Sequence, residues 1–280
     1  MKVGAGMKVR PRSISISSGK GGTGKTTLTA NLGIALGNLG RDVTILDGDL
    51  AMANLAIIMG MHKCEVNFFD VLAGKADISD VVYKNYGIKV VPTGFRFEDI
   101  HDVLAGLKKE KVEKSIGELL RQTEFLLIDA PAGIADSTII SIAAAREMIS
   151  VTNPTYASLV DVYKTIRLAN MLGAWTRGLV VNRVGKAADL SLDDIEHFMS
   201  KALGAMPILA DIPEDPKVLE AEREGVPVVV YEPECPASVA INELAKVVAG
   251  EADLPYTPSA KDEVDETIRR LTRALTGRRA

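Results

Sequence analysis

A glycine-rich stretch near the N-terminus carries the residues best suited to chemistry. Gly19–Thr26 matches the pattern G-x-x-x-x-G-K-[ST], between an apolar run and a helical run. In such a loop, backbone N–H groups surround phosphate oxygens, the lysine reaches the β- and γ-phosphates, and the following hydroxyl binds Mg²⁺. We expect Lys25 to be a catalytic cation and Thr26 a metal ligand. The predicted nucleotide-binding residues of the loop are Gly19, Gly21, Gly22, Thr23, Gly24, Lys25, Thr26 and Thr27.

A second lysine, Lys20, lies inside the same loop. Lys25 already serves the phosphates that its own loop binds, so a further lysine is crowded away from them. This crowding favours a phosphate presented by another subunit as the target of Lys20. The alternative is an ordinary solvated loop lysine.

Aspartates follow two apolar runs that read as strands. Asp47 and Asp49 come directly after one run, and Asp129 ends the run that begins at Phe125. Acidic side chains two residues apart at the carboxyl end of a strand both face the phosphate side once the chain turns. Carboxylates there can hold Mg²⁺ or orient water. The alternatives are an Asx-turn pair at 47 and 49 and a helix cap at 129.

The string Lys20–Thr27 resembles the deviant Walker A motif of the MinD/ParA family of P-loop ATPases, and its MinD-like members in particular. Further matches extend the resemblance over roughly residues 12–250. It implies ATP and Mg²⁺ as cofactors, and an ATP-sandwich dimer in which Lys20 reaches the partner's nucleotide. Many MinD proteins carry a Glu after Asn-Pro that makes a similar contact, whereas this chain has Thr155 there.

The resemblance also implies roles for single residues at the strand ends. Asp49 is expected to hold the attacking water and the metal shell, with Asp47 in support. Asp129 resembles the acid that meets Mg²⁺ through water. Gly133, a few residues later, resembles the glycine whose N–H senses the γ-phosphate.

Two later segments resemble the adenine-binding segments of the family. Asn182 and Arg183 end one predicted strand, and Asn182 is expected to bond the base. Pro213, Glu214 and Asp215 follow the next strand, and their backbone is expected to close over the ring. Because phosphate, metal and base elements must converge on one site, the sequence predicts one domain there, although 280 residues alone would suggest about two.

The composition is that of an ordinary folded protein, with 47% apolar and 25% charged residues. This excludes disorder, and no run approaches the ~18 apolar residues of a membrane span. Aromatic residues make up only 5% and the net charge is −4, which disfavours DNA binding. Cys64 and Cys235 do not fit the cysteine pattern of the iron–sulfur relatives. We therefore expect reduced thiols in a cytoplasmic protein without a redox role.

Short apolar runs alternate with helical-period segments, the pattern of a parallel sheet with crossover helices. The sequence therefore predicts an α/β protein of the P-loop NTPase fold, with a mostly parallel central sheet of about seven to eight strands and helices on both faces. Strands are expected near 13–17, 42–46, 88–91, 125–128, 148–152, 178–181 and 205–209. Helices are expected near 25–39, 97–107, 112–122, 137–145, 159–172, 192–203, 216–224 and 237–249.

The chain is expected to divide into four parts. These are an N-terminal extension (1–11), a P-loop ATPase domain (12–250), a linker rich in Pro and polar residues (251–262) and a C-terminal amphipathic helix (263–280).

The C-terminal segment has one apolar stripe, formed by Val264, Ile268, Leu271 and Leu275. The arginines expected on the opposite side are Arg269, Arg270 and Arg273. Such a helix suits peripheral contact with the anionic inner face of the cell membrane. The alternative is a helix packed on its own domain or on a partner protein.

Together these features predict a MinD-like, Mg²⁺-dependent ATPase switch that dimerises on ATP binding. Slow turnover is expected because no strong general base is visible. Such a switch would position partners in the cell, as in cell division, together with a regulatory protein that the sequence does not identify. The alternatives are a ParA-type ATPase that uses DNA as its track, which the net charge disfavours, and a nucleotide-regulated scaffold or polar-positioning protein.

Overall fold

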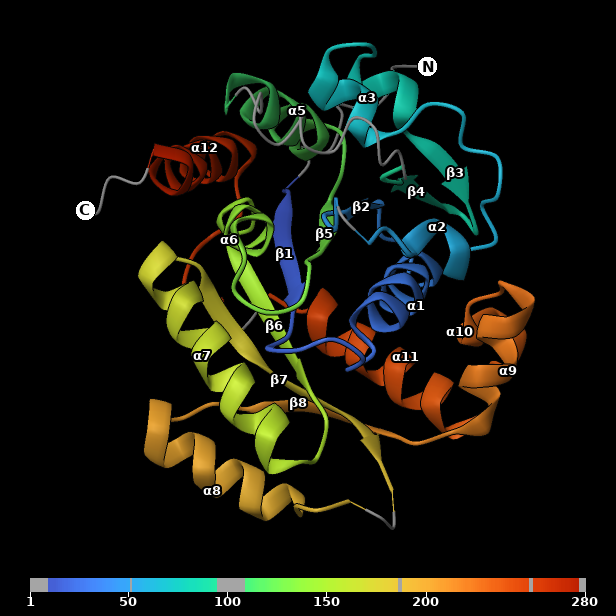
Figure 1. Ribbon diagram of the computed structural model, residues 1–280, viewed down its shortest axis with the longest axis vertical. Coiled ribbons are helices and arrows are strands. Elements are labelled where there is room, and N and C mark those ends of the chain that lie inside the picture. Colours follow the sequence, from blue (N-terminus) through green and yellow to red (C-terminus); the bar gives the residue numbers. More distant parts are fainter. Residues whose placement is uncertain (1–9, 51, 95–108, 186–187, 252–253, 277–280) are drawn as a thin grey trace, which may run out of the picture.

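An eight-stranded sheet forms the centre of the protein, in the order β3-β4-β2-β5-β1-β6-β7-β8 (Figure 1). The computed structural model describes residues 10–50, 52–94, 109–185, 188–251 and 254–276. All neighbouring strands are parallel except β3 and β4, so the predicted mostly parallel sheet is confirmed. The strands are β1 (Arg12–Ser17), β2 (Val43–Asp47), β3 (Tyr83–Asn85), β4 (Ile88–Val91), β5 (Phe125–Asp129), β6 (Glu147–Thr152), β7 (Trp175–Val184) and β8 (Ile208–Pro213).

Helices cover both faces of the sheet, as predicted (Figure 1). They are α1 (Lys25–Asn38), α2 (Leu55–Ile58), α3 (Phe68–Ala73), the 3₁₀ turn η1 (Ile78–Val81), α5 (Lys109–Arg121), α6 (Asp136–Ala143), α7 (Tyr156–Leu172), α8 (Leu192–Leu203), α9 (Pro216–Glu224), α10 (Val228–Tyr231), α11 (Pro236–Ala249) and α12 (Ala260–Thr276). Ile14 and Ile16 of β1 pack on the face covered by α1, α10 and α11. Leu126 and Ile128 of β5 pack on the other face, against α5, α6 and α12. Strands buried on both faces in this way are continuously apolar.

β7 extends over Trp175–Val184, beyond the expected 178–181. Two further strands also differ from the predictions. β8 runs over Ile208–Pro213 and not 205–209. Among the described strands it is an edge strand that pairs only with β7, which is why it can end on a proline. β3 was not predicted, because a strand of three partly polar residues shows too little alternation of apolar and polar side chains. A turn at Tyr86 and Gly87, both with positive φ, places β3 antiparallel to β4. The helix expected at 97–107 lies outside the described residues.

The C-terminal helix α12 packs against the domain, where it contacts α5, α6 and α7. Val264 and Leu271 of its apolar stripe are buried. The prediction that Arg270 lies on the opposite, solvent-facing side is wrong, because only 2% of this residue is exposed. Its burial is compensated by hydrogen bonds, since Nε donates to the backbone oxygen of Ala143 (3.4 Å) and Nη2 donates to Thr267 (3.0 Å).

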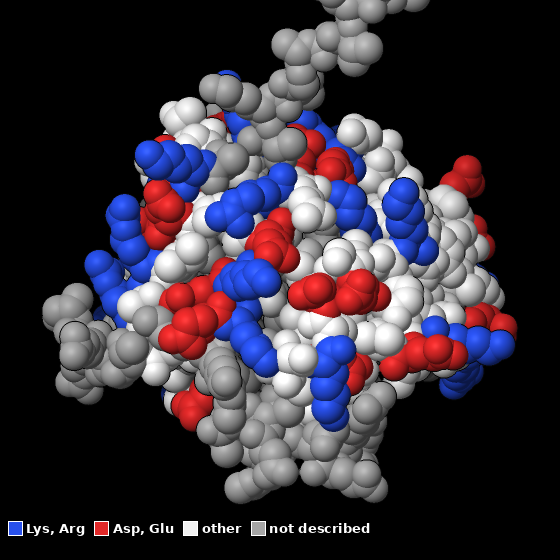
Figure 2. All heavy atoms as spheres, turned by 90° about the horizontal axis from the view of Figure 1, so that it is seen from above, with Lys and Arg blue, Asp and Glu red and all other residues white. Residues whose placement is uncertain are grey.

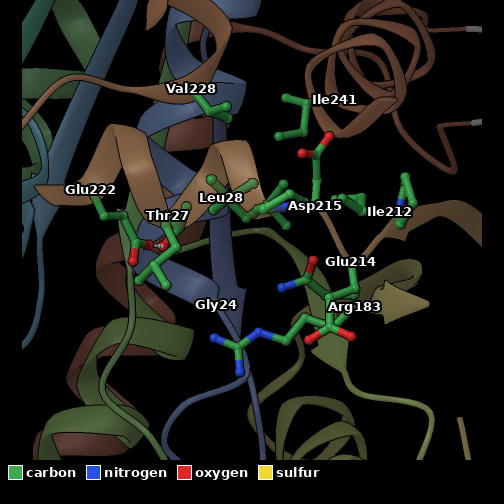
Figure 3. A pocket seen from close by; sticks show the side chains of 15 residues that line it. Gly24, Thr27, Leu28, Arg183, Ile212, Glu214, Asp215, Glu222, Val228 and Ile241 are labelled. Carbon is green, nitrogen blue, oxygen red and sulfur yellow. Dashed lines mark hydrogen bonds between the residues drawn. The ribbon is translucent and has the colours of Figure 1, made fainter. Parts of the chain in front are cut away.

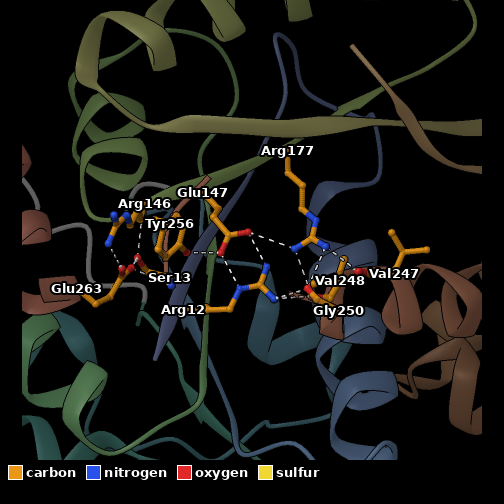
Figure 4. A network of polar contacts seen from close by, with 10 residues as sticks. All are labelled: Arg12, Ser13, Arg146, Glu147, Arg177, Val247, Val248, Gly250, Tyr256 and Glu263. Carbon is orange, nitrogen blue, oxygen red and sulfur yellow. Dashed lines mark hydrogen bonds and ion pairs between the residues drawn. The ribbon is translucent and has the colours of Figure 1, made fainter. Parts of the chain in front are cut away.

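A buried charge network joins the segment before α12 to the amino-terminal edge of the sheet (Figure 4). The carboxylate of Glu147 accepts two hydrogen bonds from Arg12, at 2.7 and 2.6 Å, one from Arg177 at 3.3 Å and one from the hydroxyl of Tyr256 at 2.6 Å. Both arginines also donate to the backbone oxygen of Val248, near the carboxyl end of α11, whose dipole favours positive charge. The segment predicted as a linker is therefore anchored to the domain through Tyr256.

Charges of both signs are interspersed on the face that carries α5 and α12 (Figure 2). Neither lysines and arginines nor acids form a continuous patch on that face. Among the described helices, none combines the length and the apolar character needed to cross a bilayer.

Candidate functional site

The phosphate loop lies between the carboxyl end of β1 and the start of α1, as predicted. Gly22 and Gly24 have φ angles of 75° and 88°, a backbone conformation that glycine adopts without strain. Gly19 packs directly on α7, since a Cβ atom there would lie 2.2 Å from the backbone carbon of Asp161. The glycines are therefore required both for the curvature of the loop and for its close approach to α7.

The predicted strand-end acids converge beside the loop. Asp47 of β2 and Asp129 of β5 are register partners on adjacent strands. Both are almost fully buried, and so is Lys25, which is 8% exposed. Burial lowers the pKa of Lys25, while the charges of Asp129 and Asp49 act in the opposite direction. The site thus holds a buried cation next to a cluster of acids.

Burial also controls the acids themselves. It raises the pKa of Asp129 to about 6, although hydrogen bonds from Thr26 and Thr29 and the charge of Lys25 act to lower it. Burial, together with the nearby Asp129, raises the pKa of Asp47 well above its ordinary value. A cation bound beside these two buried carboxylates would offset their charge and make their ionisation less costly.

This arrangement fits Mg²⁺ bound together with phosphates. Oδ2 of Asp47 is buried and has no hydrogen-bond partner within the described part of the chain. Thr26 already contacts Asp129, as a metal ligand and its supporting acid would. No three His, Cys, Asp or Glu side chains among the described residues gather into a metal cage. Mg²⁺ commonly uses one or two carboxylates and completes its shell with phosphate oxygens and water.

Asp49 takes part in the turn after β2. Its backbone N–H donates to Oδ1 of Asp47 (3.1 Å), and its own Oδ1 accepts from the N–H of Met52 (2.9 Å). The Asx-turn alternative is thus present in the structure. The half-buried Asp49 also lies close enough to influence Lys25, so its role toward water stays a prediction.

Gly133 and Lys20 both lie at the phosphate loop. Gly133 has a φ of 82°, and its N–H donates to the backbone oxygen of Ser18 (3.2 Å). The hydroxyl of Ser18 in turn donates to the backbone oxygen of Lys20 (2.8 Å), and Lys20 is half-buried. The loop after β5 is therefore tied directly to the phosphate loop, whereas the target of the Lys20 ammonium stays a prediction.

A cavity of about 600 Å³ opens beside the phosphate loop (Figure 3). The predicted base-binding residues all line it: Asn182, Arg183, Pro213, Glu214 and Asp215. They come from the ends of β7 and β8, which the sheet places side by side. The structure therefore brings these residues together at one cavity, and their contact with the base stays a prediction.

Two of these residues, and Thr155 outside the cavity lining, also stabilise the local structure. Nδ2 of Asn182 donates to the backbone oxygen of Thr23 (2.8 Å), which fixes β7 to the phosphate loop. Asp215 caps α9 by accepting from the N–H of Lys217 (2.9 Å). Thr155, which stands where many MinD proteins have Glu, caps α7 by accepting from the N–H of Ser158 (3.3 Å).

Several cavity residues were not predicted from the sequence. Glu222 of α9 accepts a hydrogen bond from the hydroxyl of Thr27 (2.5 Å), and both face the cavity opposite Asp215 (Figure 3). Val228 and Ile241 form a further wall. Glutamate, valine and isoleucine in or near helices carry no local signal of a binding role, so only the approach of α9, α10 and α11 to α1 reveals them.

The family model described as "ParA: NUBPL iron-transfer P-loop NTPase" matches residues 10–249. An uncharacterized ATP-binding protein of Methanocaldococcus jannaschii is 40% identical over 268 residues, which cover 95% of this chain and 97% of the relative. The septum site-determining protein MinD of Pyrococcus horikoshii, solved in complex with Mg-ADP, is 36% identical with a TM-score of 0.77, over 87% of this chain and 98% of that one. A chain of the MinC:MinD cell division complex of Aquifex aeolicus is 30% identical with a TM-score of 0.73, over 89% and 99%.

These similarities span nearly the whole described domain, including both sides of the cavity. The family description mentions iron transfer; in this chain Cys64 is half-buried after α2, and Cys235 is buried at the start of α11. Since the family model covers more than half of the sequence and a relative matches almost end to end, the chain belongs to the ParA/MinD family of P-loop NTPases.

Proposed function

We propose that this protein is a MinD-like, Mg²⁺-dependent ATPase switch. The observation that carries the proposal is the convergence of Lys25, Thr26 and the buried pair Asp47 and Asp129 beside a cavity of about 600 Å³. The solved MinD relative with Mg-ADP supports the choice of nucleotide and metal.

The residues at the site suggest how hydrolysis proceeds. Lys25 neutralises the β- and γ-phosphates, and Thr26 and the aspartates hold the metal. Mg²⁺ bound with ATP supplies further neutralisation of the phosphate charge. Asp49 orients the attacking water. Phosphoryl transfer depends on positioning and charge more than on a strong base, so we expect slow turnover suited to a timer.

ATP binding is proposed to pair two copies of the chain. Lys20 lies in the phosphate loop, on the same edge of the sheet as the predicted γ-phosphate sensor Gly133. A second copy docked on this edge would bring its bound nucleotide next to Lys20 of the first copy. The paired form then recruits a regulatory protein, as the MinC:MinD complex of the Aquifex relative suggests.

Peripheral attachment to the inner face of the cell membrane through residues 263–280 stays a prediction. Because Val264 and Leu271 are buried against the domain, α12 would have to undock before its apolar stripe could meet lipid. Sedimentation with anionic vesicles, in ATP and in ADP, tests this step. Parallel sedimentation with DNA tests the ParA-type alternative. ATP hydrolysis that neither vesicles, DNA nor a partner stimulates would favour the scaffold alternative.

The central experiment compares Lys25→Ala with the parental protein in a phosphate-release assay with Mg²⁺ and ATP. We expect the variant to lose hydrolysis and to bind nucleotide weakly, because the charge on the nucleotide's phosphates is no longer neutralised by Lys25. An unchanged rate would refute the site.

Lys20→Ala should behave differently. It should bind nucleotide but fail to dimerise with ATPγS in light scattering, whereas Lys246→Ala, an exposed lysine on α11, should dimerise normally. An ATPγS-dependent dimer of Lys20→Ala would refute the role of Lys20 in the partner's site.

A further inference from the structure

The face of α12 that packs on the domain buries polar as well as apolar side chains. Besides Val264 and Leu271, it buries three polar residues almost completely, namely Glu263, Thr267 and Arg270. Burying an ionised carboxylate and a guanidinium is costly unless each finds specific partners. This helix therefore recognises a particular surface of its own domain.

The partners of Glu263 lie at the start of the central strand. Its Oε1 accepts from the N–H of Ser13 (3.2 Å) and from the Ser13 hydroxyl, and its Oε2 faces Arg146 at 3.3 Å (Figure 4). Ser13 belongs to β1, the strand that leads into the phosphate loop.

The partner of Arg270 lies at the end of α6. Its Nε donates to the backbone oxygen of Ala143, the last residue of that helix. A positive charge at this position complements the negative end of the helix dipole. α6 has only eight residues, so contacts with its neighbours must fix its position.

The other end of α6 adjoins the nucleotide site. α6 begins at Asp136, and Gly133 in the loop just before it donates its N–H to Ser18 of the phosphate loop. A displacement of α6 is therefore a displacement of the loop that carries Gly133. α12 contacts the opposite, carboxyl-terminal end of α6, although it lies far from α6 in the sequence.

We propose that Arg270 is a positioning residue of the ATPase, which acts through α6 to hold the Gly133 loop where it can contact a γ-phosphate. The inference rests on the proposed function, because it assigns α12 a part in that same site. The C-terminal helix is then a component of the nucleotide machinery. Removing its contact with α6 impairs recognition of the γ-phosphate, which ATP has and ADP lacks.

The test compares Arg270→Gln with Arg269→Gln. Arg269 is the adjacent residue, is exposed, and shares Glu266 as an ion-pair partner, but within the described residues no hydrogen bond or ion pair joins its side chain to α6. Affinities for ADP and for ATPγS are measured with Mg²⁺ by fluorescence titration. In Arg270→Gln we expect ATPγS to bind about 3- to 10-fold more weakly while ADP affinity changes less than about twofold. Arg269→Gln should match the parental protein for both.

Two further variants separate positioning from general loosening of α12. Arg270→Lys keeps the charge and should restore part of the ATPγS affinity. Thr272→Val removes the hydrogen bond from Thr272 to Glu113 on α5, so it weakens docking there while it leaves the hydrogen bond from Arg270 to Ala143 in place. It should leave the ratio of ATPγS to ADP affinity unchanged.

The outcomes are distinct. If Arg270→Gln keeps the parental affinity ratio, or if Thr272→Val lowers the ratio as much, the positioning role is refuted and α12 only stabilises the domain. Should Arg270→Gln fail to fold, Arg270→Lys takes its place: a ratio of ATPγS to ADP affinity below the parental one, with α12 still protected from protease, supports the positioning role, and a parental ratio refutes it. If the parental protein binds neither nucleotide, the proposed function itself is wrong.

Discussion

Asp129→Asn should stabilise the ligand-free protein while damaging its site. Asp129 is 2% exposed, and its burial raises the pKa from 3.8 to about 6. At neutral pH the folded protein must therefore ionise a carboxyl group that resists ionisation. Asparagine has nearly the same shape, its oxygen can still accept from Thr26 or Thr29, and it carries no charge.

The size of the effect follows from the pKa shift. A rise from 3.8 to about 6 corresponds to about 3 kcal/mol of unfolding free energy once the carboxyl is ionised in both states. A raised pKa means that the folded state holds the proton more tightly, so this contribution is present below about pH 4 and is lost as the pH rises through about 6. The stability gain of Asp129→Asn should therefore be about 1 kcal/mol at pH 4.5 and about 3 kcal/mol at pH 7.5.

Urea unfolding followed by circular dichroism measures both values, with EDTA present and no nucleotide. The matched measurement adds Mg²⁺ and ADP, where the parental protein should gain more stability than the variant because the variant has lost a metal-site acid. A variant that is no more stable than the parental protein at pH 7.5, or a stability difference that does not change with pH, would contradict this account of Asp129.

Three other changes have expected outcomes. Asp49→Ala should still bind ATP and dimerise, while the loss of about 2 to 4 kcal/mol of water positioning slows single-turnover hydrolysis roughly 30- to 1000-fold; a variant that stays monomeric in ATP would place this residue in the dimer contact instead. Glu147→Gln leaves Arg12 and Arg177 buried without their counter-charge and should cost about 3 to 5 kcal/mol in urea unfolding. The nucleotide affinity of this variant should not change, because Glu147 lies at the amino end of β6 and the nucleotide site lies at the carboxyl ends of the strands. A weakened affinity would contradict that separation. Tyr256→Phe removes one hydrogen bond to Glu147 and should cost about 1.5 to 3 kcal/mol by the same measurement; no loss would mean that this segment is not anchored there.

Much of the site could be predicted because its signals are local. The spacing of Gly22, Gly24 and Lys25 specifies the backbone of the phosphate loop within a few residues, and that backbone is what binds phosphate. Asp47 and Asp129 were placed by their position at the ends of apolar runs and by the family resemblance, and the structure makes them register partners on adjacent strands. The base-binding segments were identified by their resemblance to the family's adenine-binding segments, and their convergence was predicted from the roles that this resemblance implies.

The phosphate loop, the strand-end acids and the parallel sheet could be predicted from the amino-acid sequence, because each depends on short-range spacing and on apolar runs. The surface that covers the apolar stripe of α12, and the burial of Arg270 in it, became visible only in the packed domain. An amphipathic pattern indicates that one face of a helix is apolar, but it does not indicate which surface that face meets. The same holds for Glu222 and Ile241 in the cavity walls. Their positions depend on contacts between residues far apart in the chain, and no local pattern encodes such contacts.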